Sequence, residues 1–312
     1  MIPERIIHTS ELTKDYGGFR AVNRLNLSVR AERITGFLGR NGAGKSSTIK
    51  MLLGMICPTS GSGTVLGYAI DDPRQSIEIR KHIAYVGEDK GLYGYMTVAE
   101  LIRFTRSFYS DWQPDLERRL LAEYRLPPHR KVKALSKGMR TKLALLLALS
   151  RRPALLILDE PTEGLDPVSI EELLQALVAA PANGTSVFFS SHQLSEVERI
   201  ADDILMIDRG SVVLDMSLEQ IRENYRRISL GFSTAAPRLE SMRGIERVRR
   251  DGRQIVILAS SNADAIAQLG RDRGAVDINV SPVSLREIFL ETVQERNHQD
   301  QQHPLEHEDA LV

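Results

Sequence analysis

The sequence predicts an α/β protein whose core is a parallel β-sheet carrying a phosphate-binding loop. Two observations predict this fold. Three apolar runs, Arg33–Leu38, Ala154–Leu158 and Ser186–Phe189, each end directly in glycine, acidic or hydroxyl residues, a pattern typical of buried parallel strands. The first run leads into the glycine-rich stretch Gly39–Ser46, and a segment with helical periodicity follows it. Strand, loop and helix in this order are typical of a nucleotide-binding core.

The other elements are predicted from apolar periodicity and from turn residues. Between the first two apolar runs lies a more helical stretch, interrupted at Pro127-Pro128, which we interpret as a helical insertion. The expected strands of the first region, beyond the three runs, are Ile6–Leu12 and Asn26–Val29; its expected helices are Ser46–Leu53, Val98–Phe108, Asp115–Tyr124 and Arg140–Leu149.

The length of 312 residues predicts about two domains. We expect the first at 1–215, with a helical subdomain at about 91–150, and the second at 216–294. After a helix at Leu218–Asn224, the second has the order βαββαβ, which predicts a small ferredoxin-like α+β unit. Its expected elements are strands at Ile228–Phe232, Gln254–Leu258 and Val276–Val280, a further strand before the Asp251-Gly252 turn, and helices at Asp264–Leu269 and Leu285–Val293. The polar tail 295–312 is expected to be disordered.

Composition and charge exclude several classes of protein. Lys plus Arg total 41 and Asp plus Glu total 41, so there is no net positive charge to attract nucleic acid, and none is expected as a partner. The single cysteine, Cys57, cannot form an internal disulfide, and the N-terminus lacks the features of a signal peptide. The longest apolar run, Leu143–Leu149, is too short to cross a membrane. We therefore expect a cytoplasmic protein.

The stretch Gly39–Ser46 matches the pattern G-x-x-x-x-G-K-S/T at every fixed position. Its glycines allow successive backbone N–H groups to point inward, and the helix that begins there adds the positive end of its dipole. Lys45 can then reach the β- and γ-phosphates, and Ser46 can hold Mg²⁺. The loop alone predicts nucleotide binding and nothing more specific.

The run Ala154–Leu158 ends in a pair of carboxylates that supplies the second half of such a site. Asp159 is expected to hold the metal or its waters, because it stands at the carboxyl end of a strand. Glu160 is expected to be the general base that deprotonates the water attacking the γ-phosphate.

With these motifs in place, residues 4 to 215 resemble the ATP-binding subunits of ABC transporters. Leu135–Met139 is similar to the LSGGQ signature of that family, whose Ser and Gly engage the γ-phosphate of ATP held by a partner subunit, a role that falls here on Ser136 and Gly138. Gly164–Pro167 looks like the D-loop, which crosses the dimer interface. His192 resembles the switch histidine, which contacts the γ-phosphate and orients the attacking water.

The resemblance carries two further roles and includes three departures. Tyr16 matches the aromatic residue that stacks on adenine, and Glu88 stands where the Q-loop of the family carries Gln. Glu88 keeps an oxygen for Mg²⁺ but adds a charge and removes an amide donor. In the signature, Lys137 replaces the first Gly and Met139 replaces the Gln.

The resemblance implies a P-loop NTPase core of the ABC ATPase type that binds ATP and Mg²⁺. It implies two partners: a second copy or a homologous ATPase subunit, and a membrane-spanning transporter subunit of the ABC-2 exporter kind. It also implies that this chain is peripheral at the inner face of the cell membrane. Gly91–Met96 is apolar and aromatic enough to belong to the surface that contacts this partner, or alternatively to pack internally. The expected catalytic residues are Glu160, His192 and Lys45, the expected nucleotide-binding residues are Tyr16, Gly39, Asn41, Gly42, Ala43, Gly44, Lys45, Ser46, Ser47, Ser136 and Gly138, and the expected magnesium ligands are Ser46, Glu88 and Asp159.

Two other classes of function use the same nucleotide core. One is an ATPase of DNA repair, chromosome organisation or translation, although such relatives commonly carry a long coiled coil or a second ATPase domain that this sequence lacks. The other is a regulatory protein that uses ATP only as a switch, and the altered signature and Glu88 leave room for it.

Overall fold

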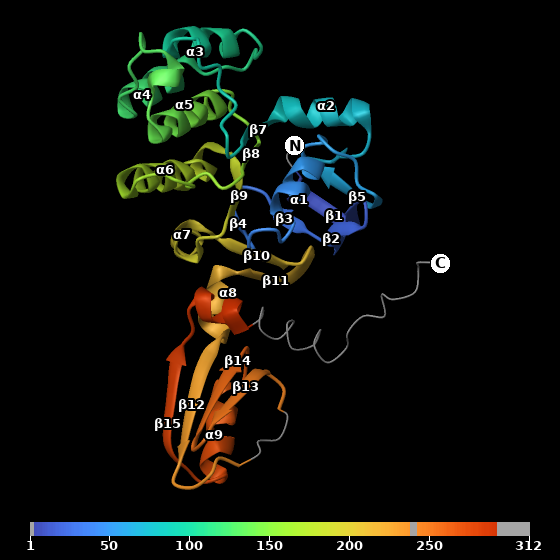
Figure 1. Ribbon diagram of the computed structural model, residues 1–312, viewed down its shortest axis with the longest axis vertical. Helices are drawn as coiled ribbons and strands as arrows, with labels where there is room; N and C mark the ends of the chain where they lie inside the picture. Colours follow the sequence, from blue (N-terminus) through green and yellow to red (C-terminus); the bar gives the residue numbers. More distant parts are fainter. Residues whose placement is uncertain (1–2, 238–241, 292–312) are drawn as a thin grey trace. The chain divides into compact units, whose positions relative to one another are not determined.

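The computed structural model describes residues 3–237 and 242–291. The chain divides into two compact units, of which the first ends at Asp215 and the second begins at Met216 (Figure 1).

A six-stranded sheet forms the centre of the first unit. Four neighbouring pairs, β10/β4, β4/β9, β9/β8 and β8/β7, run parallel, so the carboxyl ends of these strands meet along one edge. This confirms the parallel sheet that the three apolar runs predict. Its strands, in the order β11-β10-β4-β9-β8-β7, are β4 (Ile34–Leu38), β7 (Ile83–Val86), β8 (Leu155–Leu158), β9 (Ser186–Ser191), β10 (Asp203–Asp208) and β11 (Ser211–Ser217).

A second sheet with antiparallel pairing lies beside the first. It contains β1 (Arg5–Tyr16), β2 (Phe19–Leu25), β3 (Ser28–Arg30), β5 (Ser60–Val65) and β6 (Tyr68–Ala69). The strand expected at Ile6–Leu12 is therefore longer than predicted, and β2 was not predicted at all. Gly17 and Gly18, both with positive φ, form the tight turn that folds β2 back onto β1, so these glycines belong to a hairpin.

Helices cover the sheets and form the insertion. In Figure 1, α3, α4 and α5 group together apart from the antiparallel sheet, and all three lie within residues 91–150, where the helical subdomain is predicted. Side-chain caps set several helix starts. Ser136 caps α5, which begins at Lys137, three residues before the predicted start at Arg140, and Thr97 and Glu100 form a capping box on α3. The helices of the first unit are α1 (Lys45–Leu52), α2 (Pro73–His82), α3 (Val98–Arg106), α4 (Pro114–Glu123), α5 (Lys137–Leu149), α6 (Pro167–Ala179) and α7 (Leu194–Ile200), with 3-10 turns at Val132–Ala134 and Pro181–Asn183.

The main apolar core joins the two sheets through α1. Ile7 and Val65 of the antiparallel sheet, Ile49 of α1, and Phe37 and Phe188 of the parallel sheet are fully buried in one cluster. The rings of Phe37 and Phe188 contact each other, with centroids 5.1 Å apart. This packing fixes β4, and therefore the loop that follows it, against the neighbouring strands.

The second unit begins with α8 (Leu218–Asn224) and continues as a four-stranded antiparallel sheet. Its strands, β12 (Arg226–Phe232), β13 (Ile245–Asp251), β14 (Gln254–Ala259) and β15 (Ala275–Pro282), lie in the order β13-β14-β12-β15, the order of a ferredoxin-like sheet. Helix α9 (Ala263–Asp272) covers one face, and residues 285–291 are helical.

The first helix of the predicted βαββαβ order, between its first and second strands, is wrong over the described residues. Between β12 and β13, residues 233–237 and 242–244 are not helical. Pro237 cannot continue a helix from the preceding residues, and Ala236 and Met242 instead pack directly against the apolar core of the sheet. The predicted tail at 295–312, and the end of the helix expected at Leu285–Val293, lie outside the described residues.

Candidate functional site

The phosphate-binding loop joins β4 to α1, as the sequence predicts. Gly44, the N-cap residue of α1, has φ 102°, and a β-carbon there would lie 2.3 Å from the backbone oxygen of Ala21. Only glycine fits this position without moving β2. Lys45 Nζ folds back under the loop and donates to the backbone oxygen of Gly39 at 2.7 Å. The loop is therefore a cradle built around one buried ammonium group.

Three neighbouring strands bring the predicted catalytic residues together. Because β4 lies next to β9, and β9 next to β8, the loop after Leu38, the carboxylates after Leu158 and His192 after Ser191 all meet at the carboxyl edge of the sheet. This edge is where open α/β sheets bind ligands. The sheet order thus assembles residues that lie up to 147 positions apart, from Lys45 to His192.

Lys45, Glu160 and His192 form a continuous chain of polar contacts. Lys45 Nζ lies 3.0 Å from Glu160 Oε1, and Glu160 Oε2 lies 2.8 Å from His192 Nδ1. A carboxylate only accepts, so Nδ1 carries the proton in this contact and Nε2 faces the other way. Glu160 sits in the left-handed region at φ 47°, a strained conformation for a side chain of this size.

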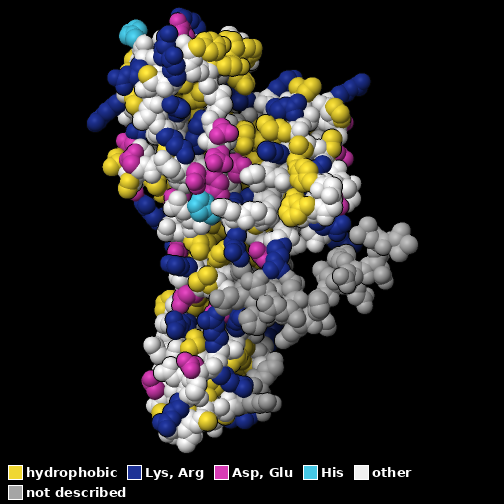
Figure 2. Space-filling view, viewed as in Figure 1, with side chains coloured by type: hydrophobic (Ala, Val, Ile, Leu, Met, Phe, Trp, Pro, Cys, Tyr) yellow, Lys and Arg dark blue, Asp and Glu magenta, His cyan; other side chains and the backbone are white. Residues whose placement is uncertain are grey.

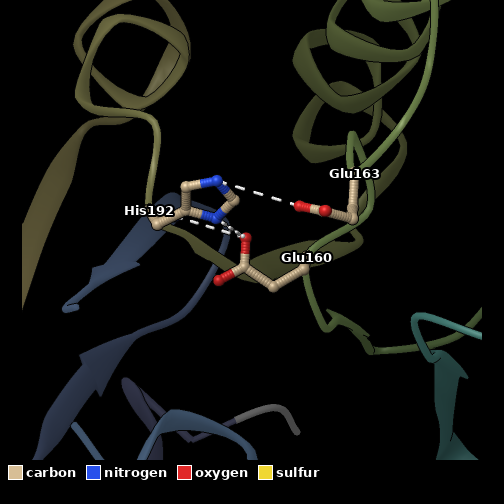
Figure 3. A group of neighbouring side chains, drawn as sticks. All are labelled: Glu160, Glu163 and His192. Carbon is tan, nitrogen blue, oxygen red and sulfur yellow. Dashed lines mark hydrogen bonds and ion pairs between the residues drawn. The ribbon is translucent and has the colours of Figure 1, made fainter. Parts of the chain in front are cut away.

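Glu163 joins this group, and sequence reasoning missed it. Figure 3 shows His192 between Glu160 and Glu163, with Glu163 Oε2 3.8 Å from His192 Nε2. The ligand atoms of the three side chains lie within 4.8 Å of one another. The signal was available, because Glu163 follows Glu160 by three residues in a loop that begins at a strand end.

Asp159 and Glu160 are held by Ser190 on the neighbouring strand. Ser190 Oγ donates to Asp159 Oδ1 at 2.6 Å and accepts from the backbone N–H of Glu160 at 2.9 Å. Glu196 supports the next turn of the loop by accepting from Thr162 Oγ1 at 2.7 Å, and its burial raises the pKa of the Glu196 carboxyl. Ser190 thus fixes the carboxylate of Asp159 and the backbone of Glu160.

A cavity of about 380 Å³ opens over the phosphate loop and the carboxylates. Figure 2 shows acidic side chains gathered beside a histidine on this face of the first unit. The cavity is lined by Phe19, Ala21, Arg40, Asn41, Gly42, Gly44, Lys45, Ser46, Ser47, Glu88, Glu160, Glu163 and His192.

Most predicted site residues line this cavity or belong to its phosphate loop, but several do not. Tyr16 is not among the lining residues, whereas Phe19, its cross-strand partner, is. Both rings are exposed, at 45% for Tyr16 and 62% for Phe19, and Lys14 Nζ covers the Tyr16 ring at 5.1 Å. Asp159 is buried and is not among the lining residues. The structure therefore adds Phe19 as an aromatic candidate that sequence reasoning missed.

The signature residues Ser136 and Gly138 do not line this cavity. Ser136 Oγ caps α5 by accepting from the backbone N–H of Met139 at 3.2 Å. Gly138 faces the start of α6, where a β-carbon at residue 138 would lie 2.5 Å from Ser169 Oγ. Glycine at 138 thus lets the starts of α5 and α6 approach closely.

A second lysine stands near the carboxylates. Lys90 Nζ donates to the backbone oxygen of Pro161 at 3.4 Å. Burial, reinforced by the positive charge of Lys137, lowers the pKa of Lys90 to about 8 despite the opposing effect of Glu88 and Asp159. Lys90 and Lys137 therefore flank the loop that follows Glu160.

Comparison with known proteins places this geometry in a family. The model of the family described as "ABC transporter" matches residues 22–163, and a shorter match at 129–198 is to an AAA domain described as putative AbiEii toxin, Type IV TA system. The uncharacterized ABC transporter ATP-binding protein YhaQ of Bacillus subtilis is 30% identical over 90% of this chain and 96% of its own length. The bacitracin transport ATP-binding protein BcrA of Bacillus licheniformis is 36% identical over 71% of this chain and 73% of its own.

Solved structures agree with these relatives. A structure described as the ATP binding subunit of an ABC transporter is 31% identical, with a TM-score of 0.63 over 70% of this chain and 92% of that one. The MJ0796 cassette, described as dimeric in a post-hydrolysis state with ADP and Pi, shares the fold at 21% identity and a TM-score of 0.61, over 68% of this chain and 98% of that one. Among the described residues, no helix is both long enough and apolar enough to cross a membrane. The chain belongs to the family of ABC transporter ATP-binding proteins, and it is an ATP-binding and ATP-hydrolysing subunit that powers a membrane-spanning partner.

Proposed function

We propose that Glu160 is the general base of ATP hydrolysis at this site. The observation that carries the proposal is the chain of contacts from Lys45 through Glu160 to His192, which joins a phosphate cradle to a base and a second proton-carrying group. Glu160 accepts the proton as the water oxygen bonds to the γ-phosphorus, and the bond from that phosphorus to the departing ADP oxygen breaks. The ammonium group of Lys45 lies 3.0 Å from Glu160 Oε1, and it is proposed to contact the phosphates instead when ATP occupies the cradle.

The residues around the loop fit Mg²⁺. Ser46 and Glu88 line the cavity, and Ser190 holds the carboxylate of Asp159; the three side chains carry the oxygen donors that Mg²⁺ prefers. When bound, the metal neutralises phosphate charge and orients the γ-phosphoryl group. The adenine ring is proposed to stack on the β1–β2 hairpin, against Tyr16 or Phe19.

We further propose that two chains bind ATP between them. Ser136 is exposed at the start of α5, Gly138 is buried next to it, and neither lines the cavity of its own chain, so the backbone at this helix start is proposed to meet the ATP of a second chain. The dimeric MJ0796 cassette offers a precedent at the level of the fold. The second copy can be identical or a homologous ATPase subunit.

The membrane partner is proposed to dock on an aromatic cluster of the helical subdomain, at the inner face of the membrane. Tyr95, Tyr93, Phe104 and Phe108 form a chain of ring contacts with centroids 5.0 to 5.9 Å apart. All four are exposed, between 39% and 67%, and Figure 2 shows an apolar patch at this end of the first unit. Clustered exposed rings of this kind mark protein-protein contacts.

We propose an exporter, because two of the relatives are named for bacitracin transport and for multidrug transport. The division of labour follows the two units. Residues 1–215 bind and hydrolyse ATP, with the helical subdomain at about 91–150 for the partner, and 216–294 form an accessory unit.

Co-purification tests the transport role. The tagged chain is recovered from gently solubilised membranes of its native cell, and its partners are identified by mass spectrometry. We expect a multi-spanning membrane protein in stoichiometric amount, and its loss when Tyr95 and Phe108 are both changed to Ala. Recovery of soluble partners alone would contradict the transport role and favour a regulatory ATPase.

The Glu160→Gln variant tests the base and the two-chain arrangement together. We expect turnover to fall about a hundredfold or more while ATP still binds, because the proton acceptor is lost but the phosphate cradle is not. With ATP and Mg²⁺ this variant should sediment as a dimer. A variant that hydrolyses ATP normally would exclude Glu160 as the base, and one that stays monomeric would exclude the shared site.

A further inference from the structure

Two ammonium groups, those of Lys90 and Lys137, lie against the loop that follows Glu160, and neither has a carboxylate within ion-pair distance among the described residues. Lys90 Nζ donates to the backbone oxygen of Pro161, and Lys137 Nζ lies so close to Gly164 that a β-carbon there would be 2.6 Å away. Within residues 3–237 and 242–291, neither lysine forms an ion pair within 4.0 Å. Lys45, by contrast, is paired with Glu160. Lys137 therefore holds an exposed positive charge beside this loop that no ion pair of the described residues uses.

The two ammonium groups also act on each other. The charge of Lys137 adds to burial in lowering the pKa of Lys90 to about 8, so the lysines are close enough to repel. This repulsion persists although Glu88, Asp159 and Asp89 oppose it. An anion that approached this surface would relieve the repulsion and gain two charge-assisted contacts.

Lys137 also stands at a helix end suited to anions. It is the first residue of α5, a helix of 13 residues whose Ser136 cap leaves other first-turn N–H groups available. The start of α6 lies beside it, but there Asp166 already accepts from the backbone N–H groups of Val168 and Ser169. Asp166 thus neutralises the N-terminus of α6 within the chain, whereas the N-terminus of α5 carries the additional positive charge of Lys137.

We propose that Lys137 is a trans-acting cation of the ATPase reaction. When two chains pair, its ammonium group leaves Gly164 and contacts a γ-phosphate oxygen of the ATP held by the phosphate loop of the partner subunit. This proposal rests on the two-chain site of the proposed function. It assigns a role to the residue that replaces the first glycine of the signature, where the backbone alone would otherwise meet the phosphate.

The chemistry of a lysine at this position has two consequences. Its ammonium group stabilises the negative charge of the γ-phosphate, so that ATP binds the pair more tightly and charge on the phosphoryl group is stabilised during transfer. Because the contact joins opposite charges at an interface, dimer formation should weaken with rising salt more steeply than it would without Lys137.

The test uses full-length Glu160→Gln as the parent, with ATP and Mg²⁺, and measures the dimer dissociation constant by sedimentation from about 50 to about 400 mM NaCl. In this background, Lys137→Met should weaken the dimer about tenfold at low salt and flatten its salt dependence, because it removes the charge at similar length. Lys137→Arg should restore most of the affinity. Lys50→Met, which removes an exposed lysine of α1, is the matched control and should behave as the parent.

ATP binding to the monomer completes the test. At protein concentrations too low for pairing, Lys137→Met should bind ATP as tightly as the parent, because its own phosphate loop is intact. A Lys137→Met dimer with unchanged affinity and salt dependence would overturn the proposal and leave the shared site standing. Loss of ATP affinity in the monomer would also overturn it, by showing that Lys137 acts within its own chain. A parent that never dimerises would reject the shared site itself, and this proposal with it.

Discussion

The phosphate loop and the signature segment are both anion-binding helix starts, but their charges are balanced in different ways. At the start of α1, Lys45 is buried and contacts Gly39 and Glu160 of the same chain. At the start of α5, Lys137 is exposed beside Gly164 and has no carboxylate partner within the part of the chain that the structure describes. One half-site is complete within its own chain, whereas the other has charge to offer a second chain. The comparison teaches that a motif's chemistry depends on which surface the fold gives it.

The largest expected effect comes from breaking the self-contained half. Lys45→Ala should lower ATP turnover about a hundredfold or more, because it removes the phosphate contact and leaves Glu160 without its buried counter-ion. Phosphate release from the purified chain measures this, with Lys50→Ala as the control for an exposed lysine of the same helix. Intact turnover in Lys45→Ala would show that the cavity described above is not the ATPase site.

His192→Ala tests what the contact between His192 and Glu160 contributes to turnover. We expect turnover to fall roughly tenfold to a hundredfold with little change in ATP affinity, because the Nδ1 contact orients Glu160 while the cradle stays intact. Separate determination of kcat and KM distinguishes the two effects. If KM rises and kcat does not change, His192 serves binding alone.

A smaller effect should separate the two aromatic candidates of the β1–β2 hairpin. Phe19 lines the cavity and Tyr16 does not, so Phe19→Ala should weaken ATP binding about threefold to tenfold and Tyr16→Ala should change it less. Calorimetric titration with ATP compares them, and titration with inorganic triphosphate, which has no base, serves as the control. The reverse ranking would restore Tyr16 as the stacking residue.

The smallest expected effect concerns stability and its dependence on pH. The pKa of Lys90 is about 8 in the folded chain and near 10.5 when unfolded, so the unfolded state binds more protons between these values and stability rises with pH across that window. Below pH 8 both states are protonated and the whole cost of the buried charge applies. Lys90→Met should therefore raise the free energy of unfolding at pH 7 by about 1 to 2 kcal/mol, a figure reduced from the full shift because solvent still reaches the group.

Urea denaturation at pH 7 and at about pH 10 measures this difference, with Lys50→Met as the matched control. The difference in the free energy of unfolding between Lys90→Met and the parent should be smaller at the higher pH. A larger difference there would mean that the ammonium group stabilises the fold through its contact with Pro161.

The sequence predicted well those features of the molecule that depend on neighbouring residues. The glycine pattern of 39–46, the apolar runs before it and before Asp159, and the fold class are confirmed, because each is encoded in neighbouring residues. The helix predicted between Phe232 and Ile245 failed over its described residues, since Ala236 and Met242 find apolar contacts without one. The functional roles given to the individual site residues remain predictions.

The sequence by itself determined that this chain has a phosphate cradle and carboxylates at strand ends. Only the tertiary structure decided which groups meet. The order β4-β9-β8 places Lys45, Glu160 and His192 in contact, the hairpin turn brings Phe19 to the cavity, and the approach of α5 to α6 sets Lys137 beside Gly164. The physical reason is that spacing along a chain fixes the geometry of a turn or a helix, whereas contacts between distant side chains depend on sheet order and packing.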